Sequence, residues 1–383
     1  MRVAHVTSFR PGSANGVHTA AAQLGAALAT AGVDVEYWHF RRDRVRVTER
    51  EDPSGVRVVE LPFPGISRSR FGYARWLPSE TRRFLARRAE LVSLVHYHSI
   101  FQPEAWYLAR TLNKPYAISP HGGYVHFRQR GWRRFARLLP WLLLERQLLR
   151  GACLVHAVSA SDGNAALALG ARGRVVVIPN GVEIPGAPAD DLTLASPWLF
   201  VGRLAIHDKG LDVLVDGYAE ASRRAALPRL VIRGPDYRGG RRWLAARIAS
   251  LGLESDIELG DALYGREKDE VFAGCSLFVH PSRTEGLPVT PLEAMARSRP
   301  LAVTPGTNLA GPVAEAGAGL VIPEATASAV ADTLQRAAGL GVDELRVRGA
   351  RGRSLVERTY SWDRVARELA ELYDECAETN GNP

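Results

Sequence analysis

The sequence predicts an α/β protein with two doubly wound parallel sheets in tandem. Short apolar runs alternate with amphipathic stretches along nearly the whole chain, which is the pattern of strands and helices in parallel sheets. The length of 383 residues exceeds what one hydrophobic core usually supports and indicates about two domains. A turn signal at 179–182, Pro-Asn-Gly-Val, and a segment with Pro and Gly after it separate two series of alternating elements.

The front half contains the first series. We expect strands at the short apolar runs 3–7, 33–40, 56–61, 91–97, 115–119, 154–158 and 175–178. We expect helices where apolar residues recur at helical spacing, at 17–31, 80–89, 104–112, 132–149 and 160–169. Residues 41–79 are rich in Arg, Pro and Gly without a clear period, so we expect mainly a variable loop region there.

The second half repeats the alternation and then becomes helical. We expect strands at 198–201, 230–232, 257–259, 277–279 and 301–303, and helices at 211–222, 241–251, 266–273 and 291–296. After Pro323 only helical patterns follow, and Ser361 is a suitable N-cap for the last helix. The predicted units are therefore a first domain at 1–183, a second at 184–360 and a C-terminal helix at 361–383.

The composition is that of a globular protein, with 46% hydrophobic and 23% charged residues. No apolar run approaches the roughly 20 residues that cross a bilayer, and residues 1–7 have the pattern of a strand rather than of a signal peptide. Cys153 and Cys275 lie in apolar runs and are expected to be buried thiols. Three cysteines without a Cys-x-x-Cys pair disfavour a disulfide framework or a zinc site. We therefore expect a cytoplasmic protein.

The net charge of +8 is unevenly distributed, because basic residues outnumber acidic ones in the front half and the reverse holds after it. A basic domain could attract phosphates, an acidic acceptor or the inner face of a membrane as a peripheral partner, or it could be ordinary solvated surface. The basic and aromatic stretch 127–141 allows the same alternatives. No nucleic-acid-binding module accompanies the charge, so no nucleic acid is expected as a partner.

The first motif with chemical potential is Gly202-Arg203-Leu204, directly after an expected strand. Parallel α/β sheets bind ligands at the carboxyl ends of their strands, and Gly202 lets the backbone approach a ligand closely. Lys209 follows six residues after Arg203 and opens the segment Lys-Gly-Leu-Asp. A guanidinium fork beside an ammonium suits a diphosphate, although an arginine after a strand is often only a surface residue.

The second motif begins at His280 and contains Glu285 and Glu293, eight residues apart. Gly286 and the neighbouring prolines shape a turn whose amides, with the N-terminus of the following helix, can receive phosphate oxygens. Carboxylates at such a site suit sugar and ribose hydroxyls, from which they accept hydrogen bonds. The alternative is that one glutamate is favoured by the helix dipole and the other is solvated.

Together the two motifs resemble those of the retaining glycosyltransferases of family four, which have the two-domain GT-B fold. The G-R-L, K-G-L-D and E-x7-E segments of that family are present at 202–204, 209–212 and 285–293. The resemblance covers nearly the whole chain. It includes a glycine-rich loop at 12–17, His121-Gly122 after a front-half strand, the hinge at 179–182 and the last helix from 360 onward.

The resemblance implies a glycosyltransferase that moves a sugar from a nucleoside-diphosphate-sugar donor to an acceptor hydroxyl. It further implies retention of anomeric configuration, no metal or other cofactor, two Rossmann-like domains facing across a cleft, and a C-terminal helix that returns to the first domain. The implied catalytic residues are His121, Glu285, Arg203 and Lys209. The implied donor-binding residues are Gly202, Arg203, Lys209, Glu285, Gly286, Leu287, Pro288 and Glu293.

Each of these residues has an implied role. Arg203 and Lys209 would neutralise the donor diphosphate, Glu285 would contact hydroxyls of the transferred sugar, and Glu293 would hold the ribose. His121 would lie near the transferred sugar. The spacing from Arg203 to Lys209 is six where five is commoner in the family. The segment Glu285-Gly286-Leu287-Pro288 also lacks the Phe-Gly that commonly precedes Leu-Pro.

Other residues of the front half are assigned to the acceptor side: Gly16, which would allow close approach to the backbone, and His18, Tyr97, His98 and His121. Histidines also occur at His5 and His96. No carboxylate or cysteine accompanies these histidines at ligand spacing, so no metal site is expected. The strand-end cluster is interpreted either as the lining of an acceptor pocket or as simple packing.

Rival functions fit less well. A dinucleotide-binding dehydrogenase would need a G-x-G-x-x-G fingerprint after the first strand, where Gly12 and Gly16 are too far apart. A non-catalytic sugar-nucleotide binder would not need a sugar contact such as Glu285. A GT-B epimerase or phosphorylase stays open as an alternative. The sequence does not distinguish UDP, GDP, ADP or dTDP as the nucleotide, nor a small natural product from a cell-surface glycan or lipid-linked intermediate as the acceptor.

Overall fold

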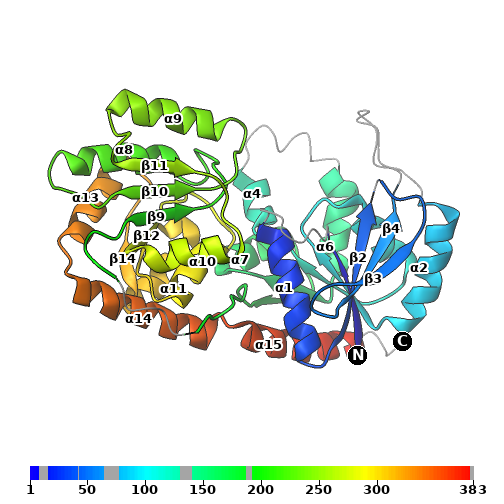
Figure 1. Cartoon of the computed structure of the whole chain (residues 1–383). Helices are drawn as coiled ribbons and strands as arrows, with labels where there is room; N and C mark the ends of the chain where they lie inside the picture. The colour runs from blue at the N-terminus through cyan, green and yellow to red at the C-terminus, as the bar shows by residue number, and fades with distance from the viewer. Residues whose placement is uncertain (8–15, 42, 64–76, 130–139, 187–191, 380–383) are drawn as a thin grey trace. The chain divides into compact units, whose positions relative to one another are not determined.

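The computed structural model describes residues 1–7, 16–41, 43–63, 77–129, 140–186 and 192–379. The chain divides into two compact units (Figure 1). The first comprises Met1–Gly181 and Trp362–Pro383, and the second comprises Val182–Ser361. Each unit is built on one sheet of mainly parallel strands, as the alternation of elements predicted. The predicted limits at 183 and 360 lie beside the observed ones.

The first unit has an eight-stranded sheet with the order β3-β4-β2-β1-β5-β6-β7-β8. Neighbouring strands are parallel except β3, which pairs antiparallel with β4. The strands are β1 (Arg2–Val6), β2 (Asp34–Arg41), β3 (Thr48–Glu51), β4 (Arg57–Pro62), β5 (Leu94–His98), β6 (Tyr116–Ser119), β7 (Leu154–Ala157) and β8 (Arg174–Val177). The helices are α1 (Gly16–Thr30), α2 (Ser79–Leu91), α3 (Pro103–Thr111), α4 (Gly123–Gln129), the π-helix η2 (Trp141–Glu145), α6 (Arg146–Gly151), α7 (Ala160–Ala168) and α15 (Trp362–Thr379).

The second unit has a six-stranded, wholly parallel sheet with the order β11-β10-β9-β12-β13-β14. Its strands are β9 (Trp198–Val201), β10 (Leu230–Arg233), β11 (Ile257–Gly260), β12 (Leu277–His280), β13 (Leu301–Val303) and β14 (Gly319–Val321). Its helices are α8 (Leu211–Ser222), α9 (Gly240–Leu251), α10 (Gly265–Gly274), α11 (Val289–Ala296), the 3-10 helix η3 (Pro305–Thr307), α12 (Ala310–Ala316), α13 (Ala327–Ala338) and α14 (Val342–Thr359).

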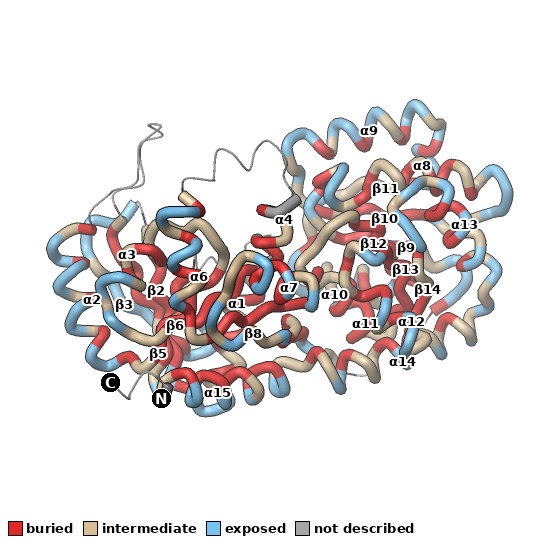
Figure 2. The backbone as a smooth tube through the Cα atoms, turned by 180° about the vertical axis from the view of Figure 1, so that it is seen from behind, coloured by how far each residue is buried: buried red, intermediate tan, exposed pale blue. Residues whose placement is uncertain are grey.

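The strands are apolar because helices cover the sheets, and Figure 2 shows buried backbone running along the strands of each unit. In the first unit the last helix, α15, closes one part of the core. Its residues Val365, Leu369 and Tyr373 are buried with β1 and β2 residues such as Val3 and Val35. Full burial of each such side chain stabilises the fold by about 1.5–3 kcal/mol. The return of this helix to the first unit is therefore held by hydrophobic packing.

A disulfide joins α15 to β7, which corrects the expectation of unpaired cysteines. Cys153 precedes β7 and Cys376 lies in α15, and the structure pairs them with their Cα atoms 5.8 Å apart. The cysteines are 223 residues apart in sequence, so the sequence pattern gave no indication that they meet. Cys275 is a free, buried thiol, as expected.

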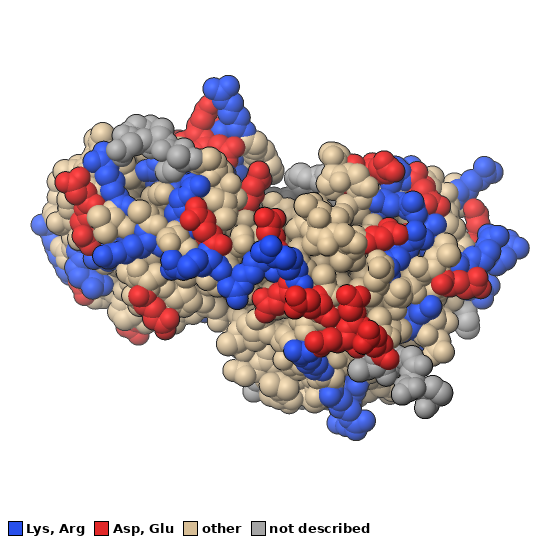
Figure 3. All heavy atoms as spheres, turned by 90° about the horizontal axis from the view of Figure 1, so that it is seen from below, with Lys and Arg blue, Asp and Glu red and all other residues tan. Residues whose placement is uncertain are grey.

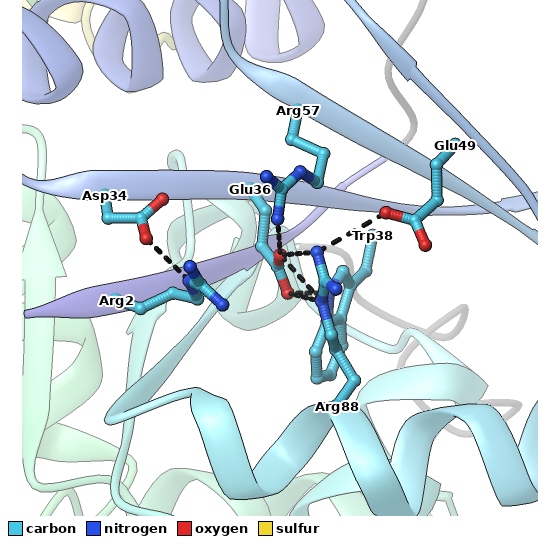
Figure 4. A network of polar contacts seen from close by, with 7 residues as sticks. All are labelled: Arg2, Asp34, Glu36, Trp38, Glu49, Arg57 and Arg88. Atoms are coloured by element: carbon cyan, nitrogen blue, oxygen red, sulfur yellow. Dashed lines mark hydrogen bonds and ion pairs between the residues drawn. The ribbon is translucent and has the colours of Figure 1, made fainter.

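Strands β3 and β4 form a β-hairpin within the segment assigned to a variable loop region, where only one strand was expected. The hairpin supplies arginines to buried carboxylates. Glu36 in β2 and Glu60 in β4 are almost fully buried. Figure 4 shows Arg88 of α2 and Arg57 of β4 converging on Glu36. Arg88 donates from Nε at 3.0 Å and from Nη2 at 2.7 Å. The indole N–H of Trp38 completes the shell at 2.8 Å.

Charges of both signs are interspersed over the face drawn in Figure 3, rather than gathered into one field. Several arginines pair with carboxylates one helical turn away, as in Arg348–Glu344 and Arg353–Glu357 of α14. Such a surface is typical of a solvated protein. Within the described ranges no helix combines the length and the apolar character that crossing a bilayer requires.

We predict that Arg88→Ala destabilises the first unit by about 2–4 kcal/mol, because it removes the main partner of a buried carboxylate. Arg87→Ala, on the same helix but at an exposed position, should change stability by less than about 0.5 kcal/mol. Urea unfolding followed by circular dichroism measures both. Equal stability of the two variants would contradict the interpretation of Glu36 as a buried charge that needs Arg88.

Candidate active site

Two loops of the second unit lie together beyond the carboxyl ends of the adjacent strands β9 and β12. Arg283, in the loop after β12, joins them. Its guanidinium donates to both carboxylate oxygens of Asp212 at 2.7 and 2.9 Å and to the carbonyl of His207 at 2.8 Å. Its backbone N–H donates to the carbonyl of Asp208 at 3.0 Å. This bidentate pairing fixes the register of the two loops.

Gly210 makes the close approach of the loops sterically possible. It adopts φ +64°, and a Cβ at this position would lie 2.1 Å from the carbonyl oxygen of Pro281. Only glycine tolerates both the left-handed backbone and the contact. The glycine of the Lys-Gly-Leu-Asp motif therefore sets the place of the lysine before it.

Lys209 and Glu285 form an ion pair at this junction. The same carboxylate oxygen, Oε1, accepts hydrogen bonds from Ser282 Oγ at 2.9 Å and His280 Nε2 at 3.3 Å. Burial would raise the pKa of the Glu285 carboxyl, but the Lys209 ammonium and the His280 imidazole outweigh it and hold this pKa well below its usual value. Every hydrogen bond between Glu285 and a described side chain uses Oε1, so Oε2 can accept from a ligand.

The turn after Glu285 is held by its backbone. The Glu285 N–H donates to the carbonyl of Gly306 at 2.8 Å, and the Asn308 side chain donates to the carbonyls of Glu285 and Gly286 at 2.9 and 2.8 Å. Helix α11 starts directly after Pro288, which has no side chain that could cap the first-turn amides. The turn Gly286–Pro288 thus leads into a helix N-terminus of the type that binds anions.

Glu293 lies in α11 with its side chain 15% exposed. Lys268 of α10 donates to its Oε1 at 2.6 Å. The other oxygen, Oε2, is buried and has no hydrogen-bond partner among the described residues. An orphaned buried carboxylate oxygen is costly unless a ligand satisfies it. Glu293 therefore has an acceptor to offer to a hydroxyl.

Arg203 follows β9 and Gly202 and is exposed. Its guanidinium lies over the ring of Tyr237, 5.1 Å from the centroid, in the loop after β10. No ion pair holds it within the described part of the chain. The structure thus brings Lys209 and Glu285 into contact and places Arg203 at the same end of the sheet, stacked on an aromatic face.

The predicted acceptor-side residues lie in the first unit. His18, Tyr97 and His98 line one pocket of about 140 Å³ at the carboxyl ends of β1 and β5. His121 follows β6 with φ +51°, and its Nε2 lies 3.1 Å from Nδ1 of His98. Gly16 begins α1, whereas residues 12–15 of the glycine-rich loop lie outside the described residues.

A buried carboxylate supports the turn that carries His121. Burial raises the pKa of Asp162, in α7, to about 6, and the backbone N–H groups of Gly122 and Val158 oppose this rise. Asp162 thereby interacts with the residue directly after His121. The sequence did not single out Asp162, because an aspartate in the first turn of a helix usually needs no further explanation.

The sequence assigned no role to several other residues of the site, although four of them lie within the two motifs. His280, Ser282, Arg283, Asp212 and Asn308 hold the loops after β9 and β12 and the turn after Glu285, and Lys268 pairs with Glu293. The bidentate acid–base pair of Arg283 and Asp212 spans 71 residues of sequence, and no local spacing indicates such a pair. Each lies within one of the two motifs, but neither motif indicates that they pair.

Comparison with known proteins follows the same division. Residues 14–184 match the family model "Glycosyltransferase Family 4", and residues 196–339 match "Glycosyl transferases group 1". The chain is 27% identical over 333 residues to the GDP-mannose:cellobiosyl-diphosphopolyprenol alpha-mannosyltransferase of Xanthomonas oryzae pv. oryzae. That alignment covers 84% of this chain and 85% of the relative.

Solved structures show the same fold. Sucrose-phosphate synthase from Thermosynechococcus elongatus superposes with a TM-score of 0.76 at 20% identity, covering 98% of each chain. HepE of Anabaena, in complex with UDP and glucose, has a TM-score of 0.72 at 14% identity, covering 98% of this chain and 100% of HepE.

The two parallel-sheet units, and the solved structures that they resemble, show the GT-B fold. Both of its units match models of that class of transferase. The chain belongs to the family 4, group 1 type of glycosyltransferases.

The buried histidines of the first unit should make its stability sensitive to acid. Burial lowers the pKa of His5 to about 3 and of His156 to about 4, and it lowers those of His96 and His98 as well. The unfolded chain binds protons near pH 6.5, so stability is complete above that pH and is lost as the pH falls toward 4.

Relative to pH 7.5, protonation at pH 5.5 should lower the free energy of unfolding by roughly 1 kcal/mol for each of His5 and His156, and His96 and His98 act in the same direction. Asp162 titrates in the opposite sense and offsets only about half of one histidine's share. Urea unfolding at the two pH values tests the prediction. His156→Gln removes one titrating group, so the free energy of unfolding should fall less between pH 7.5 and 5.5 in this variant. Equal stability at pH 7.5 and 5.5 would show that these imidazoles are not buried neutral.

Proposed function

We propose that the chain transfers a sugar from a nucleoside-diphosphate-sugar donor, held by the second unit, to an acceptor hydroxyl. The observation that carries the proposal is the Lys209–Glu285 ion pair, which joins the loops that follow β9 and β12. It places an ammonium beside a carboxylate that still has one oxygen available to accept from hydroxyls. A phosphate and a sugar ring need these two groups side by side.

In the proposed reaction, negative charge develops on the leaving diphosphate as the bond to the sugar breaks. Lys209, Arg203 and the amides at the start of α11 stabilise that charge, while Glu285 accepts from the hydroxyls of the sugar. Glu293 Oε2 accepts from the ribose, which would satisfy its orphaned lone pairs. His121 contacts the transferred sugar from the acceptor side.

Two finer features complete the proposal. The lysine and arginine supply the positive charge that a divalent ion supplies in other transferases, so transfer needs no metal. The sugar is transferred with retention, and the leaving phosphate takes the proton of the acceptor hydroxyl. Analysis of the product's anomeric configuration by NMR tests retention, and an inverted product would contradict it.

The donor class is supported by the relatives. The Xanthomonas transferase is named for GDP-mannose, and HepE is in complex with UDP and glucose. The acceptor is proposed to enter the 140 Å³ pocket lined by His18, Tyr97 and His98. Its polar lining suits a hydroxyl-bearing molecule, either a small product or the sugar end of a glycan intermediate.

We predict that Lys209→Ala and Glu285→Gln each lower transfer by at least about a hundredfold, because each removes a group that acts on the departing charge or on the sugar. Circular dichroism should show a native fold for both variants, although Lys209→Ala lowers stability because it leaves the Glu285 carboxylate without its cation. Glu220→Gln, which breaks the surface ion pair between Glu220 of α8 and Arg224, is the matched control and should keep full activity. Wild-type turnover by either site variant would refute the donor-site assignment.

We predict that one of UDP, GDP, ADP or dTDP raises the melting temperature of the chain in the presence of EDTA, since a ligand that binds only the native state stabilises it. Glu293→Gln should weaken that shift through loss of the ribose contact. Melting scans of both proteins at saturating nucleotide measure the effect. A shift that appears only with added Mg²⁺ or Mn²⁺ would contradict metal independence.

A further inference from the structure

Polar side chains of the first unit form one unbroken hydrogen-bonded series across its sheet. The series begins at a backbone carbonyl after β8, crosses β7, β6 and β5, passes through α15 to β1, and ends on the turn after β6. Its contacts are Ile178 O to His156 Nε2 at 2.9 Å, His156 Nδ1 to Ser119 Oγ at 2.8 Å, Ser119 Oγ to His96 Nε2 at 2.7 Å, His96 Nδ1 to Tyr373 Oη at 2.5 Å, Tyr373 Oη to His5 Nε2 at 3.5 Å, His5 Nδ1 to His98 Nε2 at 3.0 Å and His98 Nδ1 to His121 Nε2 at 3.1 Å.

The carbonyl of Ile178 fixes the donor and the acceptor of each hydrogen bond in the first half of the series, from Ile178 to His96. A carbonyl only accepts, so His156 must carry its proton on Nε2, and its Nδ1 is then a lone pair. The hydroxyl of Ser119 must donate to that lone pair. Its oxygen therefore accepts from His96, which must also carry its proton on Nε2.

The hydroxyl of Tyr373 determines the donor and the acceptor of each hydrogen bond in the second half of the series, from Tyr373 to His121. It donates to Nδ1 of His96 and accepts from Nε2 of His5. The Nδ1 of His5 is then a lone pair that accepts from Nε2 of His98. His98 in turn offers Nδ1 to the Nε2–H of His121. All five imidazoles are thus the same tautomer.

We propose that this series, anchored at the carbonyl of Ile178, fixes His121 as the Nε2-protonated imidazole and presents its Nδ1 as a hydrogen-bond acceptor to a substrate hydroxyl. Tyr373, His5 and His98 are then positioning residues for His121. The inference rests on the proposed contact of His121 with the sugar, and it assigns the atom and the protonation state of that contact.

Burial keeps the series neutral, as the argument requires. His5, His96, His98 and His156 are each at most 3% exposed, and burial lowers their pKa values and that of His121. No described residue donates to Nδ1 of His121. Aligned hydrogen bonds polarise one another, so Nδ1 is the negative end of five aligned dipoles. That polarity suits a sugar that becomes positive as its bond to the diphosphate breaks.

The tautomer of each histidine can be read by long-range ¹H–¹⁵N correlation NMR on the full chain with ring-labelled histidine, assigned by single His→Gln variants. We expect His5, His96, His98, His121 and His156 to be Nε2-protonated at pH 7.5. A proton on Nδ1 of any of these would overturn the proposal.

Tyr373→Phe cuts the series at its midpoint. We expect His96 and His156 to keep their tautomers, because they stay joined to the carbonyl, whereas His121 becomes a mixture of both. Tyr37→Phe is the matched control, since it removes an equally buried hydroxyl that donates to the carbonyls of Ala21 and Ala22. A single, unchanged tautomer of His121 in Tyr373→Phe would overturn the proposal.

Kinetics test the substrate part. Tyr373→Phe should lower kcat by about tenfold with donor KM changed less than twofold, because the oriented contact acts on the transition state, and Tyr37→Phe should keep the wild-type kcat. If kcat is unchanged in Tyr373→Phe although His121 is a mixture of tautomers, the inference is overturned and the proposed function is not. Full activity of His121→Ala would instead refute the proposed contact with the sugar, independently of the NMR result.

A metal ion is the competing explanation for this cluster. Ligand nitrogens of His5, His96 and His98 lie within 4.8 Å of one another, and an ion there would take the lone pairs that the hydrogen bonds use. Titration of EDTA-treated protein with Zn²⁺, followed by the same NMR signals, separates the two. Stoichiometric binding that shifts these three histidines would overturn the proposal, and unshifted signals would support it.

Discussion

The candidate site of the second unit depends on one electrostatic constraint, which is that the largely buried carboxylate of Glu285 has a cation in contact. Lys209 meets it, and the neighbouring structure serves to bring the two together. Gly210 permits loop contact that any side chain would block, and Arg283 ties the loops through Asp212. Because a lone buried charge costs several kcal/mol, the pair also keeps the ammonium in place in the absence of a ligand.

The first unit solves the problem of buried polar groups differently. Its core histidines are neutral and satisfy one another, and a backbone carbonyl ends the series. Its buried carboxylates instead receive dedicated donors, as Glu36 does from Arg88 and Glu145 from Trp106 and Tyr124. In both cases a partly satisfied network would be worse than an apolar core. This is why single substitutions there act on more than one contact.

Much of the fold was predictable because parallel sheets produce apolar runs of distinctive length. The strands missed were β3, whose four residues are all exposed, and β14, which has three residues. The structure brings the two motif residues Lys209 and Glu285 into contact, because they lie in loops that follow two adjacent strands. The histidine series was not predictable, because His96 and Tyr373 are 277 residues apart and only packing brings them together. The same limit explains the error on Cys153 and Cys376.

Helix α15 takes part in both the hydrophobic core and the histidine series of the first unit. Its burial through Val365 and Leu369 is ordinary hydrophobic packing, yet that packing sets the position of a hydroxyl between two imidazoles. Between His96 and His5, only a group that both donates and accepts a hydrogen bond can make the tautomer of one imidazole depend on that of the other. A phenyl ring would preserve the core and interrupt the series. The packing of α15 and the protonation state proposed for His121 are therefore parts of one structural arrangement, although no described residue of the helix forms a hydrogen bond with His121.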